Sequence, residues 1–438
     1  MVTLGCKINQ SDAASLAAEL SAHGCRIVPF PGDADVTIIH TCTVTQKTDY
    51  QSRQLIRRAV TGNPGSRVIV TGCYAQVSPE SLQAILGVDF IVGTGERSHI
   101  PEIVFTEGKP RGAQIRLSPA GKEQIFEEWR LPLFPGRTRA YLKVQDGCNA
   151  FCSYCIVPYA RGKSRSLPLE RVLSQARELS ERGFKEVVLT GIHLGAYGED
   201  LLPPISLLDL LQALEREPLG LRLRLSSIEP GEFTPSLIDF LAGSTSICPH
   251  LHIPMQSGDD TLLGRMNRSY SGAFFGDLVN RLVRSIRGLA IGVDVIGGFP
   301  GEDEQAFENT MSLIERLPIA YLHVFPFSRR KGTPAAAFPG QVPSQVIRSR
   351  CRALRELGQK KRNLFFHLFL GQRLKAIVES KRDRESGMLK GYSPNYLPLI
   401  FPGGDELMNQ EVEVEVIEVR DGKVMGNLVR DSESGVRN

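Results

Sequence analysis

The sequence of 438 residues lacks any long apolar stretch. No apolar run approaches the roughly 18 residues that cross a membrane, and the chain opens on a predicted strand without the regions of a signal peptide. Its 42% hydrophobic and 23% charged residues are typical of an ordinary globular protein. We therefore expect a cytoplasmic protein without a membrane partner, folded into two or three domains of roughly 150 residues.

The chain also has little net charge and no pattern of a disulfide framework. A formal net charge of +4 is too small to indicate nucleic acid by itself. Nine cysteines in a chain without a signal peptide favour thiols that a reducing compartment keeps free for metals. Three of them, Cys25, Cys248 and Cys351, share no pattern and are predicted to be structural thiols.

A fourth cysteine is missing from the most informative motif. Cys148, Cys152 and Cys155 have the spacing C-x-x-x-C-x-x-C, and no further cysteine follows at ligand distance. Three thiolates can hold an iron-sulfur cube and leave one iron open, whereas an electron carrier normally supplies four protein ligands. A structural zinc loop is the alternative, but such loops usually pair two C-x-x-C halves. The motif therefore predicts a cluster that performs chemistry.

A second set of cysteines follows three predicted strands in the first hundred residues. Cys6, Cys42 and Cys73 each end a β-rich run. Alternating strands and helices predict a parallel sheet, and ligands bind such sheets beyond the carboxyl ends of the strands. We expect the three thiols at one edge as a second cluster site, although any one alone is more often a core residue. The predicted helices cover residues 11–23, 46–61 and 78–86.

Beyond a predicted linker lie six strand-like runs, most of which lead through a polar or glycine-rich loop into a helix. Six such units predict a barrel or partial barrel with its working residues in the loops after the strands. The linker covers residues 108–137, with a possible short helix at 123–130. The strand-like runs cover residues 140–144, 186–190, 221–226, 250–253, 290–296 and 321–325.

The loops after these strands are expected to form a cofactor pocket beside the cluster. Glycines at a strand end let a ligand approach the backbone, and a carboxylate can take a ribose hydroxyl or an ammonium group. Each loop alone also has an ordinary explanation, as a tight turn or a core histidine. The loops cover residues 190–195, 226–230, 252–258 and 294–302, and they contain Thr190, Gly191, His193, Ser227, Glu229, Gly297 and Gly298.

Basic residues are concentrated after the barrel. Residues 343–384 contain twelve Lys or Arg and three acids. Apolar positions at helical spacing predict a helix there whose basic face points outward. That face is either an ordinary solvated surface or a contact for nucleic acid.

The last sixty or so residues change period. Residues 411–416 alternate strictly between acidic and apolar side chains, and residues 420–423 supply a hairpin turn. With further strand candidates at 374–378, 388–399 and 423–429, they predict a small antiparallel β-barrel. Barrels of this kind often bind single-stranded RNA. Tyr392 and Tyr396 are predicted either to stack on bases or to pack in the core.

Together these parts resemble the radical S-adenosylmethionine (SAM) methylthiotransferases over essentially the whole chain. Residues 391–396 resemble the start of a TRAM domain. Residues 3–10, 190–198, 250–270 and 323–328 are similar to the branch that modifies threonylcarbamoyladenosine in tRNA. Only five residues precede Cys6, fewer than is usual, so we expect a short first strand and a natural start codon upstream. Ser11-Asp12-Ala13 also replaces the tyrosine, glutamate and serine of that branch.

The resemblance implies an α/β fold of three domains. These are an N-terminal parallel α/β domain at residues 1–107, a partial (β/α) radical SAM barrel at 134–364 and a small C-terminal TRAM β-barrel that binds RNA at 367–434. It implies two 4Fe-4S clusters, one on Cys148, Cys152 and Cys155 and an auxiliary one on Cys6, Cys42 and Cys73. It adds Tyr154, Phe325 and Phe327 to the loop residues that hold SAM.

The implied reaction uses two SAM molecules. One methylates sulfur at the auxiliary cluster, and the other yields a radical that takes hydrogen from carbon 2 of the adenine at position 37, where the methylthio group is attached. That carbon is not acidic, so no acid-base dyad is expected. The implied partners of a monomeric chain are tRNA and a reductant such as flavodoxin or ferredoxin.

Two alternatives remain open at this stage. One is a sister methylthiotransferase that acts on isopentenyladenosine in tRNA or on a ribosomal-protein aspartate. The other is a non-catalytic iron-sulfur regulator that binds RNA.

Overall fold

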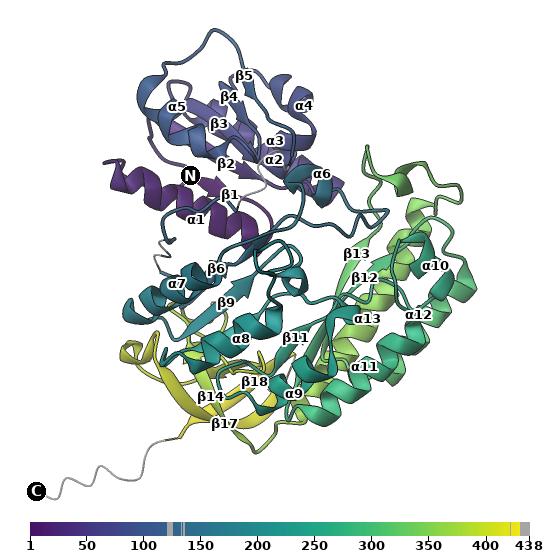
Figure 1. The fold of residues 1–438 in the computed structure, drawn as a ribbon. Helices are drawn as coiled ribbons and strands as arrows, with labels where there is room; N and C mark the ends of the chain where they lie inside the picture. The colour runs from purple at the N-terminus through teal and green to yellow at the C-terminus, as the bar shows by residue number, and fades with distance from the viewer. Residues whose placement is uncertain (121–125, 133, 135, 421, 430–438) are drawn as a thin grey trace, which may run out of the picture.

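The computed structural model describes residues 1–120, 126–132, 134, 136–420 and 422–429, in which three units follow one another along the chain (Figure 1). The first unit has a parallel sheet in the order β1-β2-β3-β4-β5. Its strands are β1 (Val2–Thr3), β2 (Val36–Thr41), β3 (Arg67–Gly72), β4 (Phe90–Val92) and β5 (Gln114–Arg116). The predicted α/β domain is confirmed, and so is the short first strand.

Helices cover both faces of this sheet because its buried strands are apolar on both sides. Ile38 and Ile69 pack with α1 (Lys7–Ala22) and α5 (Ile100–Thr106). Ile39 and Val70 pack on the opposite face. That face is covered by α2 (Gln46–Gly62), α3 (Cys73–Val77) and α4 (Pro79–Gln83).

The end of this unit differs from the prediction. Strand β5 pairs in parallel with β4, so the sheet continues into residues 108–137, which the sequence predicts as linker. The strand is short and largely exposed, and therefore has no clear apolar pattern. In the predicted helix at 123–130, residues 123–125 lie outside the described part, and residues 126–130 are not helical.

The second unit is a six-stranded partial barrel, as the sequence predicts. Two parallel sheets of three strands, β10-β9-β6 and β11-β12-β13, are joined by the isolated bridges Leu223–Ile247 and Ser227–His252. The strands are β6 (Arg139–Lys143), β9 (Glu186–Thr190), β10 (Arg222–Leu225), β11 (His250–His252), β12 (Ala290–Gly297) and β13 (Tyr321–Pro326). A short antiparallel pair, β7 (Gln145–Asp146) with β8 (Arg165–Ser166), flanks the cysteine loop.

Side chains alternate along the barrel strands between two environments. Leu189 and Leu223 pack in the main core together with side chains of the outer helices. Their neighbours Glu186 and Arg224 take the opposite face, which lines the lumen. The outer helices are α7 (Leu169–Glu181), α8 (Leu207–Arg216), α9 (Pro235–Gly243), α10 (Asp260–Arg265), α11 (Gly272–Ser285) and α12 (Glu304–Arg316), whereas α6 (Val157–Arg161) packs against α3 of the first unit.

The predicted basic helix is α13 (Ser344–His367), and it packs along β13 and β12. Arg348, Arg352 and Arg355 are exposed, which confirms the outward basic face. Arg350 does not belong to this face. It is buried and donates to Glu302 and Glu304, because it points back onto the barrel.

The third unit is a closed five-stranded barrel in the order β14-β15-β16-β18-β17. The predicted strand 388–399 is two strands, separated by a turn in which Tyr396 has φ 67°. One pair, β16 with β18, is parallel, so the barrel is not wholly antiparallel. The strands are β14 (Arg373–Val378), β15 (Leu389–Tyr392), β16 (Pro398–Phe401), β17 (Glu411–Arg420) and β18 (Lys423–Leu428).

This small barrel closes the lumen of the partial barrel at the amino ends of its strands. Arg224 donates to Pro394 O over 2.8 Å, and its guanidinium stacks 4.5 Å from the centre of the Tyr396 ring. Tyr392 stacks in turn on Tyr396, with ring centroids 5.1 Å apart. For Tyr396 the packing alternative is therefore the one that the structure supports.

None of the helices in the described residues has the length and hydropathy needed to cross a membrane.

Candidate functional site

The loop with the C-x-x-x-C-x-x-C motif is held tightly at the open end of the partial barrel. Gly147 has φ 78°, and a Cβ there would lie 1.9 Å from Lys163 O, so only glycine fits. Ser153 N donates to Met266 O and its hydroxyl donates to Arg265 O, at 3.1 and 2.7 Å. Cys155 N donates to Cys152 O over 2.9 Å. The backbone thereby wraps the three thiols around one space.

The donor chemistry of this loop fits an iron-sulfur cluster. Burial raises the pKa of Cys155 to about 12 and raises the pKa of Cys152 as well. Bare thiols in this setting stay protonated at neutral pH, whereas iron would supply the positive charge that thiolates need. The three sulfurs leave one ligand position for a cofactor.

The second cysteine set also lies at one edge, as predicted. Cys6, Cys42 and Cys73 follow the neighbouring parallel strands β1, β2 and β3. Asn9 ties two of these strand ends together, since its amide donates to Leu4 O and Thr41 O at 2.9 and 3.0 Å. A Cβ at Gly5 would lie 2.9 Å from Cys42 Sγ. Burial raises the pKa of Cys42 to about 12, so a metal bound there would supply the positive charge that its thiolate form needs.

A buried network of charges joins the two cysteine sites, and sequence reasoning missed it. Arg161, six residues after Cys155, donates to Asn9, Asp12 and Asp146. Arg97 and Lys143 complete the network with ion pairs to Asp12. Although burial alone opposes ionisation, these cations hold the pKa of Asp12 well below its usual range. No local pattern marks such residues, because Asp12 meets Arg161 and Lys143 from a different unit of the chain.

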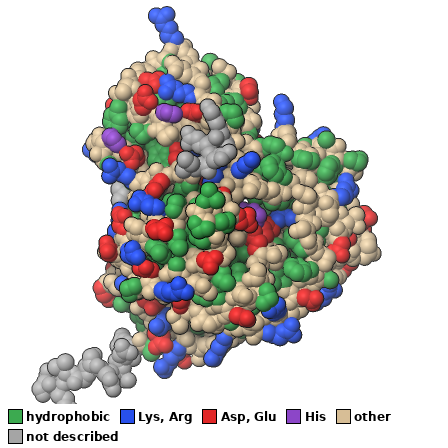
Figure 2. Space-filling view, viewed as in Figure 1, with side chains coloured by type: hydrophobic (Ala, Val, Ile, Leu, Met, Phe, Trp, Pro, Cys, Tyr) green, Lys and Arg blue, Asp and Glu red, His purple; other side chains and the backbone are tan. Residues whose placement is uncertain are grey.

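A cavity of about 180 Å³ lies between the two units. Its lining includes Tyr154, Phe325 and Phe327, three of the predicted SAM residues, and Val44 and Thr45 from the loop after Cys42. The cavity therefore meets both cysteine loops. Figure 2 shows acidic and histidine side chains gathered between the first unit and the barrel on the face in view.

The position of Tyr154 is held by Arg268, which forms an ion pair with Glu229. The sequence did not predict this pair. The Tyr154 hydroxyl accepts from Arg268 Nη2 over 2.7 Å. Glu229 is thereby placed within reach of the predicted SAM pocket. Its charge is already matched by Arg268.

The predicted residues after β9 lie beside the cluster loop. Thr190 is buried, and its hydroxyl donates to Leu142 O over 3.3 Å, which indicates a structural part. A Cβ at Gly191 would lie 2.9 Å from Gln145 Oε1. His193 Nδ1 lies 3.5 Å from Cys148 Sγ, and its Nε2 lies 2.5 Å from Glu232. Burial lowers the pKa of His193, but the bonds to Cys148 and Glu232 outweigh it and raise the pKa to about 11.

Glycine is required at positions 297 and 298 for helix packing, and not for the approach of a ligand as the sequence predicts. A Cβ at Gly297 would lie 2.9 Å from Cys351 Sγ, and a Cβ at Gly298 would lie 2.3 Å from Ile347 Cγ1. Both missing side chains point at α13, so these glycines let the helix pack closely on β12. Cys351 is confirmed as a buried structural thiol, and Cys248 is buried too.

Polar side chains of four elements line the lumen below the cavity. Ser227 Oγ lies 2.7 Å from His252 Nδ1. Asp294 and His323 follow on β12 and β13, and Asp294 also lines the cavity. Lys7 reaches the lumen from the start of α1, where burial and then the charge of Arg224 lower its pKa. Its ammonium group has no hydrogen-bond or ion-pair partner in the described part of the chain.

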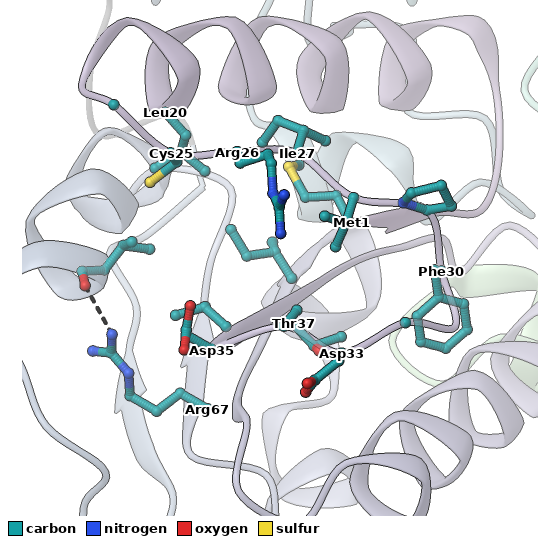
Figure 3. Close-up of a pocket in the computed structure, with 18 of the residues that line it drawn as sticks. Met1, Leu20, Cys25, Arg26, Ile27, Phe30, Asp33, Asp35, Thr37 and Arg67 are labelled. Carbon is teal, nitrogen blue, oxygen red and sulfur yellow. Dashed lines mark hydrogen bonds between the residues drawn. The ribbon is translucent and has the colours of Figure 1, made fainter.

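A larger cavity, about 370 Å³, lies away from all of these groups (Figure 3). It is enclosed by the loop from Cys25 to Asp35 at the opposite end of the first sheet, next to Arg67. The guanidinium of Arg67 is already bonded to Ile103 O and Val104 O. Among the described residues of this cavity there is no set of metal ligands.

A three-thiolate loop at the loop end of a partial βα barrel defines the radical SAM class of enzymes. Residues 142–314 match the Radical SAM superfamily, and residues 1–93 match the uncharacterized protein family UPF0004. Among solved structures the chain is similar to the radical SAM methyltransferase TsrM from Kitasatospora setae. The TM-score is 0.51 with 18% identity, over 75% of this chain and 69% of that one, which shows the shared fold.

Proteins with similar sequences show to which family of radical SAM enzymes the chain belongs. The chain is 41% identical to the threonylcarbamoyladenosine tRNA methylthiotransferase MtaB of Bacillus subtilis, over 98% of this chain and 95% of that protein. The MtaB of Aquifex aeolicus is 39% identical over 86% of this chain and 91% of its own length. The tRNA-2-methylthio-N(6)-dimethylallyladenosine synthase of Moorella thermoacetica is 31% identical over 98% of both chains. The chain belongs to the family of radical SAM tRNA methylthiotransferases, enzymes that use SAM and 4Fe-4S chemistry.

Proposed function

We propose that this enzyme attaches a methylthio group to carbon 2 of threonylcarbamoyladenosine at position 37 of tRNA, with two SAM molecules and two 4Fe-4S clusters. Relatives named for threonylcarbamoyladenosine are 34% to 41% identical to the chain. Relatives named for dimethylallyladenosine are 30% to 31% identical. Sequence identity thus favours the first substrate, and the lumen gives a physical reason.

The charge of the lumen is the observation that carries the choice of substrate. A threonylcarbamoyl group ends in a carboxylate, whereas a dimethylallyl group is apolar. Lys7 is partly buried and has no hydrogen-bond or ion-pair partner among the described residues, and the charges that act on it include those of Arg224 and Glu186 in the lumen. An apolar substituent would leave this cation buried and unpaired, which is unfavourable. A carboxylate would give it a partner.

The two cysteine sets have separate parts in this proposal. Cys148, Cys152 and Cys155 would hold the cluster that binds SAM, and Cys6, Cys42 and Cys73 the auxiliary cluster. When bound, the cofactors supply a carbon radical and a sulfur carrier. Arg161 links the two sets through its bonds to both units.

The aromatic side chains around the cavity would hold the base of the substrate. Phe325 and Phe327 offer apolar faces on one wall, and Tyr154 is held rigid by Arg268 on another. Such walls keep water away from a reactive carbon and can stack on a base. A protein reductant such as flavodoxin or ferredoxin would supply electrons to a monomeric chain in the cytoplasm, where tRNA is modified.

Mass spectrometry of tRNA nucleosides tests the proposal. In a strain without this gene, 2-methylthio-threonylcarbamoyladenosine should disappear and threonylcarbamoyladenosine should accumulate. Any methylthio derivative of isopentenyladenosine should be unchanged. The wild-type gene should restore the product, and a gene with Cys152→Ala should not. Loss of the isopentenyl derivative instead, or no change in tRNA with loss of a methylthio group from a ribosomal-protein aspartate, would overturn the proposal in favour of a sister activity.

A further inference from the structure

Two imidazoles and a carboxylate meet on the wall of the lumen, apart from both cysteine sets. The strand register brings them together. Asp294 on β12 is the direct partner of His323 on β13, and His252 on β11 is the partner of Gly292, two residues before Asp294. Because side chains alternate along a strand, all three point to the lumen. Gly292 leaves room for the Tyr321 ring between them, since a Cβ there would lie 2.1 Å from that ring.

We propose that His252, Asp294 and His323 bind one divalent transition-metal ion. The three donor atoms form a nearly equilateral triangle. His252 Nε2 lies 3.1 Å from Asp294 Oδ1 and 3.2 Å from His323 Nδ1, and the third edge is 3.3 Å. Ligands at about 2.0–2.1 Å in a tetrahedral site are about 3.3–3.4 Å apart. The observed triangle has the size of one face of such a site.

Hydrogen bonds alone explain this triangle less well than a metal ion does. Asp294 Oδ1 is buried, and neither imidazole nitrogen meets it with hydrogen-bond geometry despite the short distances. The hydrogen bond that the geometry allows joins the two imidazoles and leaves Asp294 Oδ1 without one. An ion just outside the plane of the triangle, at about 2.0–2.1 Å from each donor, would satisfy all three together.

The surroundings of His252 suit a metal ligand. Ser227 Oγ lies 2.7 Å from its Nδ1, so the hydroxyl can accept the Nδ1 proton and leave the Nε2 lone pair free for a metal. A polar group behind a ligating histidine is the usual way to fix its tautomer and ring orientation. The same triangle has an entry path, because the His323 side chain is 53% exposed.

The donor set also selects the class of ion. Two imidazole nitrogens and one carboxylate suit zinc, iron or another first-row transition metal, whereas magnesium and calcium prefer oxygen donors. Three protein ligands leave at least one position open. Since Asp294 lines the cavity, that position faces the space for the substrate and would take an anionic oxygen. The carboxylate of a threonylcarbamoyl group is such a ligand, and this last step rests on the proposed function.

Zinc binding to the complete enzyme tests the metal site without any use of tRNA. Protein with both cysteine sets loaded with iron and sulfide is mixed with one equivalent of zinc chloride, desalted and analysed for zinc and iron. Wild type should retain about one zinc per chain, and its X-ray absorption should show nitrogen and oxygen ligands at about 2.0–2.1 Å without sulfur. His323→Gln should retain at least tenfold less zinc with unchanged iron.

Two further variants test whether the zinc is bound by this set of residues. Ser227→Ala should weaken zinc binding by about tenfold while it keeps all three ligands. His99→Gln removes an exposed histidine that also pairs with a carboxylate, Glu96, and should bind zinc like wild type. Zinc with sulfur ligands near about 2.3 Å, or equal zinc in wild type and in His323→Gln, would overturn the proposal. Neither outcome would bear on the nucleoside product, so failure here is distinct from failure of the proposed function.

Discussion

Arg161 donates a hydrogen bond of 3.0 Å to Asp12 across the boundary between the first unit and the barrel. Asp12 lies in α1, the helix that begins after Cys6, and Arg161 ends the helix that follows Cys155. The same guanidinium donates to both oxygens of Asp146, two residues before Cys148, at 2.9 and 3.0 Å. Arg161 thus links the two cysteine sites directly, and Lys143 adds a second bridge to Asp12.

Asp12→Asn should loosen this junction. The substitution leaves Arg97, Lys143 and Arg161 in a buried site with one negative charge fewer, and breaking a buried ion pair typically lowers stability by about 3–5 kcal/mol. We expect a lower thermal unfolding midpoint and a greater loss of methylthio product than of 5′-deoxyadenosine. Glu128→Gln is the matched control, since its partner Arg171 is exposed, and its unfolding midpoint should match wild type. A wild-type midpoint for Asp12→Asn would contradict the role of the network.

The two cysteine sets should separate in cofactor and activity measurements. Cys152→Ala removes one of three anchors of the SAM cluster and should abolish 5′-deoxyadenosine formation. Cys42→Ala should lower iron by about one cluster per chain and abolish methylthio product, yet retain some 5′-deoxyadenosine formation. Cys248→Ala, which changes a buried thiol outside both sets, should keep both iron and activity. Equal product from Cys42→Ala and wild type would remove the first set from the reaction.

Regular features of the chain could be predicted from sequence because they follow from local pattern. Strands β1 to β3, the six strands of the partial barrel and the edge that gathers Cys6, Cys42 and Cys73 follow from apolar runs and from alternation with helices. The Asp12 position illustrates the limit. Sequence comparison marks it only as a departure from a familiar glutamate, whereas the structure shows that its carboxylate still pairs with Arg97 and Arg161.

Contacts between distant elements could not be predicted in this way. Nothing local distinguishes Arg350, which is buried against Glu302, from the exposed arginines on either side. The glycines at 297 and 298 suggest a ligand until the packing of α13 is known. His323 joins Asp294 only through the register of two strands, and register depends on the whole sheet.

Lys7 should determine how tightly the substrate binds. If its ammonium pairs with the threonyl carboxylate, Lys7→Gln should raise KM for threonylcarbamoyl-tRNA by about tenfold, a loss of about 1.4 kcal/mol, with a smaller effect on kcat. Lys7→Arg keeps the charge and should recover most of the affinity. Because Lys7 adjoins Cys6, iron content and 5′-deoxyadenosine formation without tRNA are measured as controls. An unchanged KM for Lys7→Gln would place the carboxylate elsewhere.

The exposed face of α13 should bind the phosphates of tRNA. Arg348, Arg352, Arg355 and Arg362 are exposed and form no ion pair with any residue in the described ranges. Changing all four to Ala should weaken binding and reduce the slope of log affinity against log salt by about one unit for each phosphate that is no longer neutralised. Arg281 and Arg284 on α11 are equally exposed, and their replacement should leave the slope unchanged. A weaker affinity with an unaltered slope would indicate a packing role instead.

Glu186 should make the contact between the partial barrel and the C-terminal barrel less stable at acidic pH. Its carboxylate accepts two hydrogen bonds from Arg224, at 2.8 and 2.9 Å, and one from Arg222 at 2.8 Å. Burial alone would raise its pKa, but the arginines outweigh burial and lower it to about 2. Both arginines also donate to carbonyls of the C-terminal barrel, at Tyr392 and Pro394. Loss of the carboxylate would therefore loosen two units at once.

A lowered carboxyl pKa fixes the direction of the pH effect. The pair stabilises the folded state fully above the pKa of an unfolded glutamate, about 4.3, and the stabilisation is lost as the pH falls from there towards about 2. At pH 7, Glu186→Gln should lower the unfolding midpoint by about 5–10 °C, as expected for on the order of 3 kcal/mol. The difference between the unfolding midpoints of wild type and Glu186→Gln should be constant between about pH 6 and 8 and become smaller below about pH 4.3. Both proteins are compared with the same content of iron-sulfur clusters. Glu217→Gln, at an exposed pair with Arg177, should show a smaller difference from wild type throughout. A difference that increased as the pH fell would contradict the assignment, because it would require the protonated form of Glu186 to be the stabilising one.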